Sequence, residues 1–162
     1  MRLRNLFCAG ILLMPALFPT MATANTIAEQ HRYLARTILS IGIPVTMNRN
    51  HHCPPGESGS YFPAGFMVIC QDHHTGNGKE VQWTANDYDT LRHEAHHLLQ
   101  DCATGLIGDR KMSLMFNTKE ELLGFLSRSG YSREQLQSIV NHYQRQGVDG
   151  YNLLMELEAF AV

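Results

Sequence analysis

Five consecutive residues, His93-Glu94-Ala95-His96-His97, combine side chains that together can bind a metal ion and move a proton. His93 and His97 are four positions apart, and side chains at that spacing lie one above the other on a helix. Two imidazoles arranged in this way can bind one ion. Glu94 is rotated about 100° from His93 around the helix axis, so its carboxylate lies beside the ion and can take a proton from metal-bound water. The spacing therefore predicts two metal ligands and a general base.

The residues around this motif have the pattern of a helix with one buried face. Thr84 and Asp87 resemble a capping box and predict that the helix begins here. Gly105 closes the segment. Apolar side chains recur at helical spacing in between, at Leu91, Ala95, Leu98 and Cys102. This buried stripe leaves the two outer histidines of the motif on a different face.

The flanking segments predict an α+β fold for a single domain. A helix is expected over residues 26–40, and a β-hairpin is expected with arms at residues 61–62 and 66–70. Residues 81–83 alternate apolar and polar side chains, as a short edge strand does. Three helices should follow the central one, at residues 119–127, 133–145 and 151–162. We therefore expect a small antiparallel hairpin or sheet packed on the central helix, followed by a helical C-terminal half.

The stretch from Thr90 to Gln100 resembles the active-site helix of the zincin metallopeptidases. The short chain with a late glutamate in a helix resembles in particular the minimal, single-domain members of the gluzincin branch, the minigluzincin type. The resemblance implies that His93 and His97 bind Zn²⁺, that Glu94 is the general base, and that a glutamate downstream completes the ligand set. The sequence after His97 lacks the glycine and histidine that characterise metzincins.

Two glutamates near the C-terminus are candidates for this third ligand. Several gluzincins place an alanine three residues beyond the liganding glutamate, and Glu156 with Ala159 fits that pattern, so we expect Glu156 rather than Glu158. Glu120 and Glu121 are weaker candidates because they begin a helix, where negative charge is expected for other reasons.

Several further residues have predicted supporting roles. Gluzincins often carry an aspartate four residues past the liganding glutamate to orient a histidine, but here that position is Phe160, and Asp101 is a plausible substitute. His96 points about 100° away from His97 and is expected at the surface or behind the ligands. The hydrogen bond to a developing oxyanion could come from any of four residues: Tyr131, His142, Tyr143 or Tyr151.

The N-terminal 24 residues have the pattern of a secretory signal peptide. Arg2 and Arg4 precede an apolar run over residues 6–18, and the small-residue pattern Ala22-Thr23-Ala24 resembles a cleavage site. Two prolines interrupt the run before it reaches the ~20 apolar residues that a membrane-spanning helix needs. We therefore predict a secreted or periplasmic protein of residues 25–162 with no membrane association after cleavage.

Cleavage would leave an odd number of cysteines, Cys53, Cys70 and Cys102. An oxidising compartment then predicts one disulfide and one thiol left over, which could ligate the zinc and hold an enzyme latent. Three pairings are possible. Cys53 and Cys70 bracket a short Pro- and Gly-rich loop, which favours a disulfide between these two residues, although sequence alone does not decide the connectivity.

The charge balance and the motif together limit the function. Lys and Arg number 13 against 15 Asp and Glu, with no basic run, so nucleic acid is not an expected partner. The expected activity is zinc-dependent hydrolysis of peptide bonds in a peptide or protein substrate, which would lie extended along residues 81–83 or 66–70. Nine histidines also suggest a metal-binding protein without catalysis, to which the pairs His51-His52 and His73-His74 would contribute. A catalytically inactive binding module with a zincin fold is the third possibility.

Overall fold

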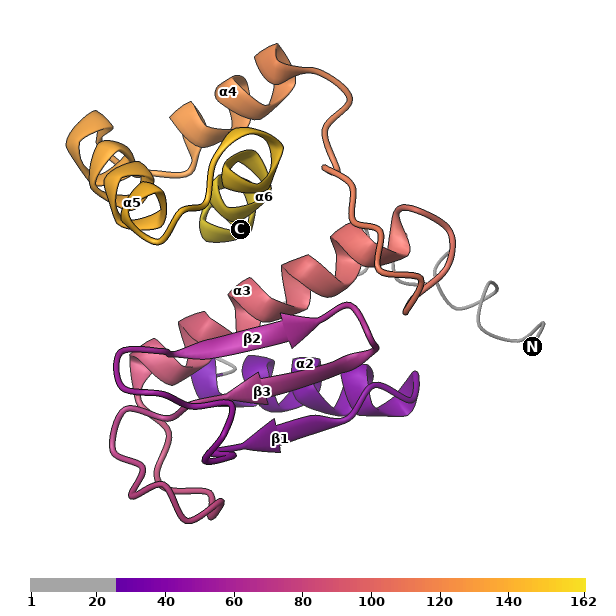
Figure 1. Ribbon diagram of the computed structural model, residues 1–162, viewed down its shortest axis with the longest axis vertical. Helices are drawn as coiled ribbons and strands as arrows, with labels where there is room; N and C mark the ends of the chain where they lie inside the picture. The colour runs from indigo at the N-terminus through magenta and orange to yellow at the C-terminus, as the bar shows by residue number, and fades with distance from the viewer. Residues whose placement is uncertain (1–25) are drawn as a thin grey trace.

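The computed structural model describes residues 26–162, which form five helices and one three-stranded sheet (Figure 1). The elements are α2 (Ile27–Ser40), β1 (Val45–Met47), β2 (Gly59–Phe62), β3 (Phe66–Ile69), α3 (Ala85–Cys102), α4 (Lys119–Arg128), α5 (Arg133–Arg145) and α6 (Gly150–Phe160). The predicted α+β class and all five predicted helices of this region are confirmed. The predicted signal peptide lies outside the described residues.

The sheet has the strand order β1-β3-β2, so β3 is central and β2 is an edge strand. β2 and β3 form the predicted antiparallel hairpin, in which Gly65 has a φ of 87° and donates its N–H to the carbonyl of Phe62 at 2.8 Å. A positive φ of this kind favours glycine because it has no Cβ. β1 was not predicted and pairs parallel with β3, so the sheet is mixed rather than purely antiparallel.

The strand predicted at residues 81–83 does not form. The backbone of Val81 bonds instead to the buried side chain of Gln71, which accepts the N–H at 2.8 Å and donates to the carbonyl at 2.9 Å. A glutamine amide offers one donor and one acceptor group, as a peptide unit does, so it can replace a neighbouring strand. The alternation of apolar and polar residues correctly predicted that Gln82 is more exposed than Val81 and Trp83. It did not predict which group forms hydrogen bonds with the backbone of Val81.

The main core lies between the sheet and the helices α2 and α3. Met67 and Ile69 of β3 face this core, whereas Val68 faces the opposite side of the sheet, as expected from the alternation of side chains along a strand. The predicted stripe of α3 is buried in the same core, with Leu91, Ala95, Leu98 and Cys102 at most 8% exposed. α3 therefore presents one face to the sheet and is free to present another to a different partner.

None of the cysteines among the described residues is free. Cys53 and Cys70 form a disulfide with a Cα–Cα distance of 5.5 Å, which confirms the favoured pairing. Cys102 is disulfide-bonded too and lies in the core, so the structure of the full chain does not contain the leftover thiol that was predicted after cleavage. A latent state held by this thiol has no support.

Helix α3 is anchored at its N-terminus by the predicted capping box. Thr84 Oγ1 accepts the N–H of Asp87 at 3.1 Å, and the Asp87 carboxylate accepts the N–H of Thr84 at 2.8 Å. The same carboxylate accepts the N–H of Asp72 at 2.9 Å, just after the central strand. The start of α3 is thus tied to the end of β3.

Helix α6 packs on the face of α3 that the sheet leaves open, and α4 and α5 pack on α6 (Figure 1). Their own small core contains Leu122, Leu126 and Leu157. Among residues 26–162, no helix combines the length and the hydropathy that crossing a bilayer requires.

Candidate metal centre

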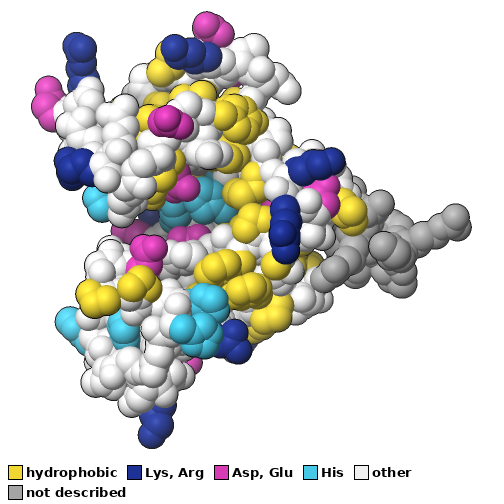
Figure 2. Space-filling view, in the orientation of Figure 1, with side chains coloured by type: hydrophobic (Ala, Val, Ile, Leu, Met, Phe, Trp, Pro, Cys, Tyr) yellow, Lys and Arg dark blue, Asp and Glu magenta, His cyan; other side chains and the backbone are white. Residues whose placement is uncertain are grey.

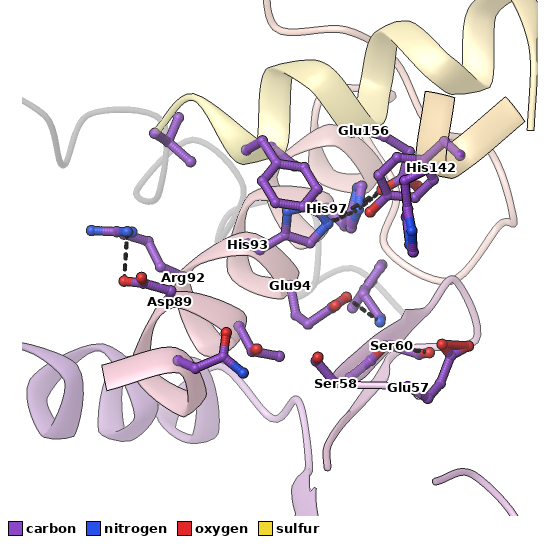
Figure 3. Close-up of a pocket in the computed structure, with 18 of the residues that line it drawn as sticks. Glu57, Ser58, Ser60, Asp89, Arg92, His93, Glu94, His97, His142 and Glu156 are labelled. Atoms are coloured by element: carbon purple, nitrogen blue, oxygen red, sulfur yellow. Dashed lines mark hydrogen bonds and ion pairs between the residues drawn. The ribbon is translucent and has the colours of Figure 1, made fainter. Parts of the chain in front are cut away.

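The two outer histidines of the motif and one glutamate of the last helix converge in the space between α3 and α6 (Figure 3). The Nε2 atoms of His93 and His97 are 3.1 Å apart. Glu156 Oε2 lies 3.2 Å from His93 Nε2 and 3.3 Å from His97 Nε2. The three residues predicted as ligands from the sequence therefore bring one atom each into a compact triangle, although 63 positions separate His93 from Glu156.

The size of this triangle fits a metal ion. Ligand atoms bound at 2.0–2.1 Å to a tetrahedral Zn²⁺ stand about 3.3 Å apart, close to the spacing of these three atoms. Two imidazole nitrogens and a carboxylate oxygen repel one another at this distance unless a proton or a cation lies between them. In the part of the chain that the structure describes, this is the single group of three histidine, cysteine or acidic side chains close enough to share an ion.

The charges of the ligands are matched to a cation. Burial of Glu156 acts to raise its pKa, but the hydrogen bonds and charges of His93 and His97 outweigh burial and lower the pKa well below the ordinary value. Burial of His97 acts to lower its pKa, but Glu156, Glu94 and Gln100 together raise it. Both directions mean that positive charge is stabilised between the imidazoles and the carboxylate.

Glu94 lies beside the triangle and points toward β2 (Figure 3). Its carboxylate is buried and accepts the backbone N–H of Tyr61 at 2.6 Å. Burial raises the pKa of Glu94, and the positive charges of His93 and His97 and the Tyr61 N–H oppose this only in part. A carboxylate with a raised pKa accepts a proton more readily near neutral pH, as a general base must.

The contact between β2 and α3 depends on a glycine at the start of the strand. A Cβ at Gly59 would lie 2.6 Å from Cγ2 of Thr90, 3.0 Å from the carbonyl oxygen of Val68 and 3.4 Å from Cγ of Glu94. Only a residue without a side chain lets the strand approach the helix this closely. This approach allows the Tyr61 N–H to reach the Glu94 carboxylate.

The edge strand beside the candidate site is β2, not either segment expected from the sequence. Residues 66–69 form the central strand, whose backbone groups are used on both sides, and residues 81–83 form no strand. Gly59, Ser60 and Tyr61 of β2 line the same pocket as the triangle. The backbone available for pairing with an extended chain therefore belongs to β2.

Support for the ligands comes from a residue that the sequence analysis missed. His97 Nδ1 lies 2.7 Å from Oε1 of Gln100, one turn farther along α3. Asp101 was expected in this role, but its carboxylate accepts the Tyr61 hydroxyl at 2.5 Å and the N–H of Gly108 at 3.2 Å. Gln100 could have been identified from the sequence, because it is three residues after His97 and residues at that spacing share a helix face.

The other acidic and imidazole candidates occupy different positions. Glu158 is fully buried and faces Gln100 rather than the triangle, whereas Glu120 and Glu121 are exposed at the start of α4. His96 is buried with its Nε2 3.5 Å from Oε2 of Glu158, so it lies behind the ligands and not at the surface.

The walls of the pocket contain three of the four predicted oxyanion donors: Tyr131, His142 and Tyr143. The fourth, Tyr151, lies elsewhere and accepts the N–H of Leu114 at 2.8 Å through its hydroxyl. Burial and the neighbouring charge of Glu156 raise the pKa of Tyr143, which keeps its hydroxyl protonated and able to donate. The ring of Phe160 packs against His93 at a centroid distance of 4.7 Å, while Nδ1 of that histidine has no hydrogen-bond partner.

The pocket opens to the surface as a hollow between the C-terminal helices and the part that contains the sheet (Figure 2). Histidine and acidic side chains are visible together inside it. The loop pairs His51-His52 and His73-His74 are not part of this group: His51 and His52 pack on each other, and His74 Nδ1 accepts the N–H of Gly76.

The chain matches no protein-family model, no curated protein and no solved structure.

Proposed function

We propose that this protein is a secreted, zinc-dependent metallopeptidase with a zincin-like domain. The observation that carries the proposal is the convergence of His93 Nε2, His97 Nε2 and Glu156 Oε2, with the buried carboxylate of Glu94 beside them in an open pocket. Three protein ligands with space for a fourth are typical of catalytic zinc sites, and structural sites are usually closed by four. The Cys53–Cys70 disulfide is compatible with an extracellular location.

Zn²⁺ is favoured by the chemistry of the donors. Two imidazoles and one carboxylate suit zinc, whereas magnesium and calcium prefer oxygen ligands alone. When bound, the metal would lower the pKa of a coordinated water and polarise the substrate carbonyl.

The residues of the chain would do the remaining work. Glu94 would accept the proton of the attacking water and pass it to the leaving amine, since its raised pKa suits it to both steps. The outer edge of β2, where Glu94 accepts the Tyr61 N–H, would pair through its remaining backbone groups with an extended peptide and hold the scissile bond near Glu94. Tyr143 or His142 would donate a hydrogen bond to the oxyanion that forms at the carbonyl carbon.

The test is cleavage of a peptide library by the purified protein, with and without added Zn²⁺. The wild-type protein should contain one zinc per chain and cleave peptides, and a chelator should abolish the activity. Glu94→Gln should keep the zinc and lose activity by roughly 10²–10⁴-fold, the range that general-base catalysis contributes.

Two controls separate this function from the alternatives. His93→Ala should lose both zinc and activity, while Glu120→Gln, an exposed glutamate remote from the pocket, should retain both. Zinc binding without any cleavage would indicate a binding module, and several weakly bound ions per chain would indicate a metal-buffering protein. Full activity in Glu94→Gln would refute the proposed mechanism.

A further inference from the structure

We propose that Glu158, acting through Gln100, is a positioning residue that selects the tautomer of His97 and so directs its Nε2 lone pair toward the metal position. This inference deepens the proposed function and rests on the same three ligands. Neither residue touches a substrate; both would act on the ligand His97.

The orientation of the Gln100 amide is determined by its surroundings. Its Nε2 donates to the carbonyl oxygen of Met155 at 3.0 Å and to Oε2 of Glu158 at 2.7 Å. Both partners are pure acceptors, so rotating the amide by 180° would set three oxygens against one another. The side chain is completely buried, and no water can relieve such a repulsion.

This orientation determines which nitrogen of His97 carries the proton. With both amide hydrogens directed at α6, Oε1 of Gln100 is the atom that faces His97 Nδ1 at 2.7 Å. An amide oxygen can only accept, so Nδ1 must donate. In the neutral imidazole the lone pair is then on Nε2, which faces Glu156 and His93. This is the form in which His97 can bind a metal through Nε2.

Glu158 is the residue that holds the Gln100 amide in a single orientation. Its side chain is 0% exposed, and its two oxygens accept the Met115 N–H at 2.9 and 3.2 Å in addition to the Gln100 amide. A carboxylate accepts from every direction, whereas an amide in its place would present one donor group and could let Gln100 turn. The buried carboxyl group therefore has a function that an amide of the same shape would not reproduce.

The helical position of Glu158 explains how one helix supplies both kinds of residue. Glu156 and Glu158 are two residues apart on α6, which rotates their side chains by about 200° relative to each other. Glu156 consequently meets the histidines at the pocket, while Glu158 reaches the far side of His97 through Gln100. The two glutamates that the sequence offers as alternatives are then complementary parts of one site.

The experiment uses the full protein with ¹⁵N-labelled histidine, freed of metal and titrated upward in pH until the His97 ring is neutral, because its carboxylate neighbours raise its pKa above the ordinary value. Long-range proton–nitrogen correlation spectra distinguish the two tautomers of each ring. The wild-type protein should show His97 with the proton on Nδ1. Glu158→Gln should show a mixture of tautomers, and its affinity for Zn²⁺ should fall by roughly 10–100-fold. Glu120→Gln is the matched control at an exposed glutamate and should resemble the wild type.

A second variant keeps the inference testable if Glu158→Gln fails to fold. Gln100→Met removes the amide but leaves the bond between Glu158 and Met115 in place, so the His97 tautomer should again be mixed. Folded variants of both kinds with the proton still on Nδ1 would overturn the inference. A wild-type protein with the expected tautomer and tautomer mixing in the variants, but no affinity for zinc, would support the positioning role and refute the peptidase function.

Discussion

Replacing Gly59 with alanine should test the close contact between β2 and the helix that carries the motif. The new methyl group would lie 2.6 Å from Cγ2 of Thr90, about 1 Å closer than two carbon atoms normally approach. Thr90 is buried and β-branched, so its side chain has few alternative rotamers, and the carbonyl of Val68 at 3.0 Å is backbone that cannot turn away. The strand must therefore shift.

Overpacking of this kind costs about 1–3 kcal/mol. In a domain of this size, such a loss lowers the melting temperature by roughly 4–12 °C, which thermal unfolding followed by circular dichroism would measure. The same shift should lengthen the bond between the Tyr61 N–H and Glu94, so peptide cleavage per folded molecule should fall as well.

Gly124→Ala is the matched control. Gly124 lies inside α4, where an added Cβ would approach only the tip of Arg128 at 3.4 Å, so the substitution should raise stability by about 0.8–1 kcal/mol. A Gly59→Ala variant with the melting temperature and activity of the wild type would refute the idea that this glycine sets the distance between β2 and α3.

Three further results are expected. Replacing Cys53 and Cys70 with serine should lower the free energy of unfolding by about 3 kcal/mol, because their disulfide closes a loop with a sequence separation of 17, and urea denaturation would measure this. In metal-free protein, the raised pKa of Glu94 means that the folded state holds a proton more tightly than the unfolded state, so stability should fall as pH rises from the ordinary glutamate pKa through the folded value. Glu94→Gln should remove this loss, so the variant should melt at a higher temperature than the wild type at pH 7 but not below about pH 4. An equal difference in melting temperature at both pH values would contradict the raised pKa of Glu94. Tyr143→Phe should keep its zinc and lose roughly 10²–10³-fold in kcat if this hydroxyl stabilises the oxyanion, and unchanged kcat would assign that role to another residue.

Features set by local patterns were predictable without the structure. The start of α3 follows from hydrogen bonds between Thr84 and Asp87, three residues apart, and the buried stripe follows from the helical period. The same period places His93 and His97 on one face, so the two imidazoles meet wherever α3 forms. The hairpin was predictable for a similar reason, because its turn closes within a few residues.

Features that depend on distant partners were not predictable. The three residues of β1 alternate apolar and polar side chains just as residues 81–83 do, and they form a strand because β3 provides the neighbouring backbone. Residues 81–83 have the pattern of a strand, yet the Gln71 side chain takes both backbone hydrogen bonds of Val81. In each case the deciding partner lies at least ten residues away, and single-residue propensities do not encode it.

The candidate site divides along the same line. The motif alone determined that two imidazoles and a carboxylate lie close together, because all three are within about one turn of the same helix. Only the packing of α6 on α3 decided that Glu156 meets His93 and His97, that Glu158 turns to Gln100, and that Asp101 bonds to Tyr61. A helix dictates the direction of its side chains but not which face another helix will cover, and that choice is made by the burial of apolar surface across the whole domain.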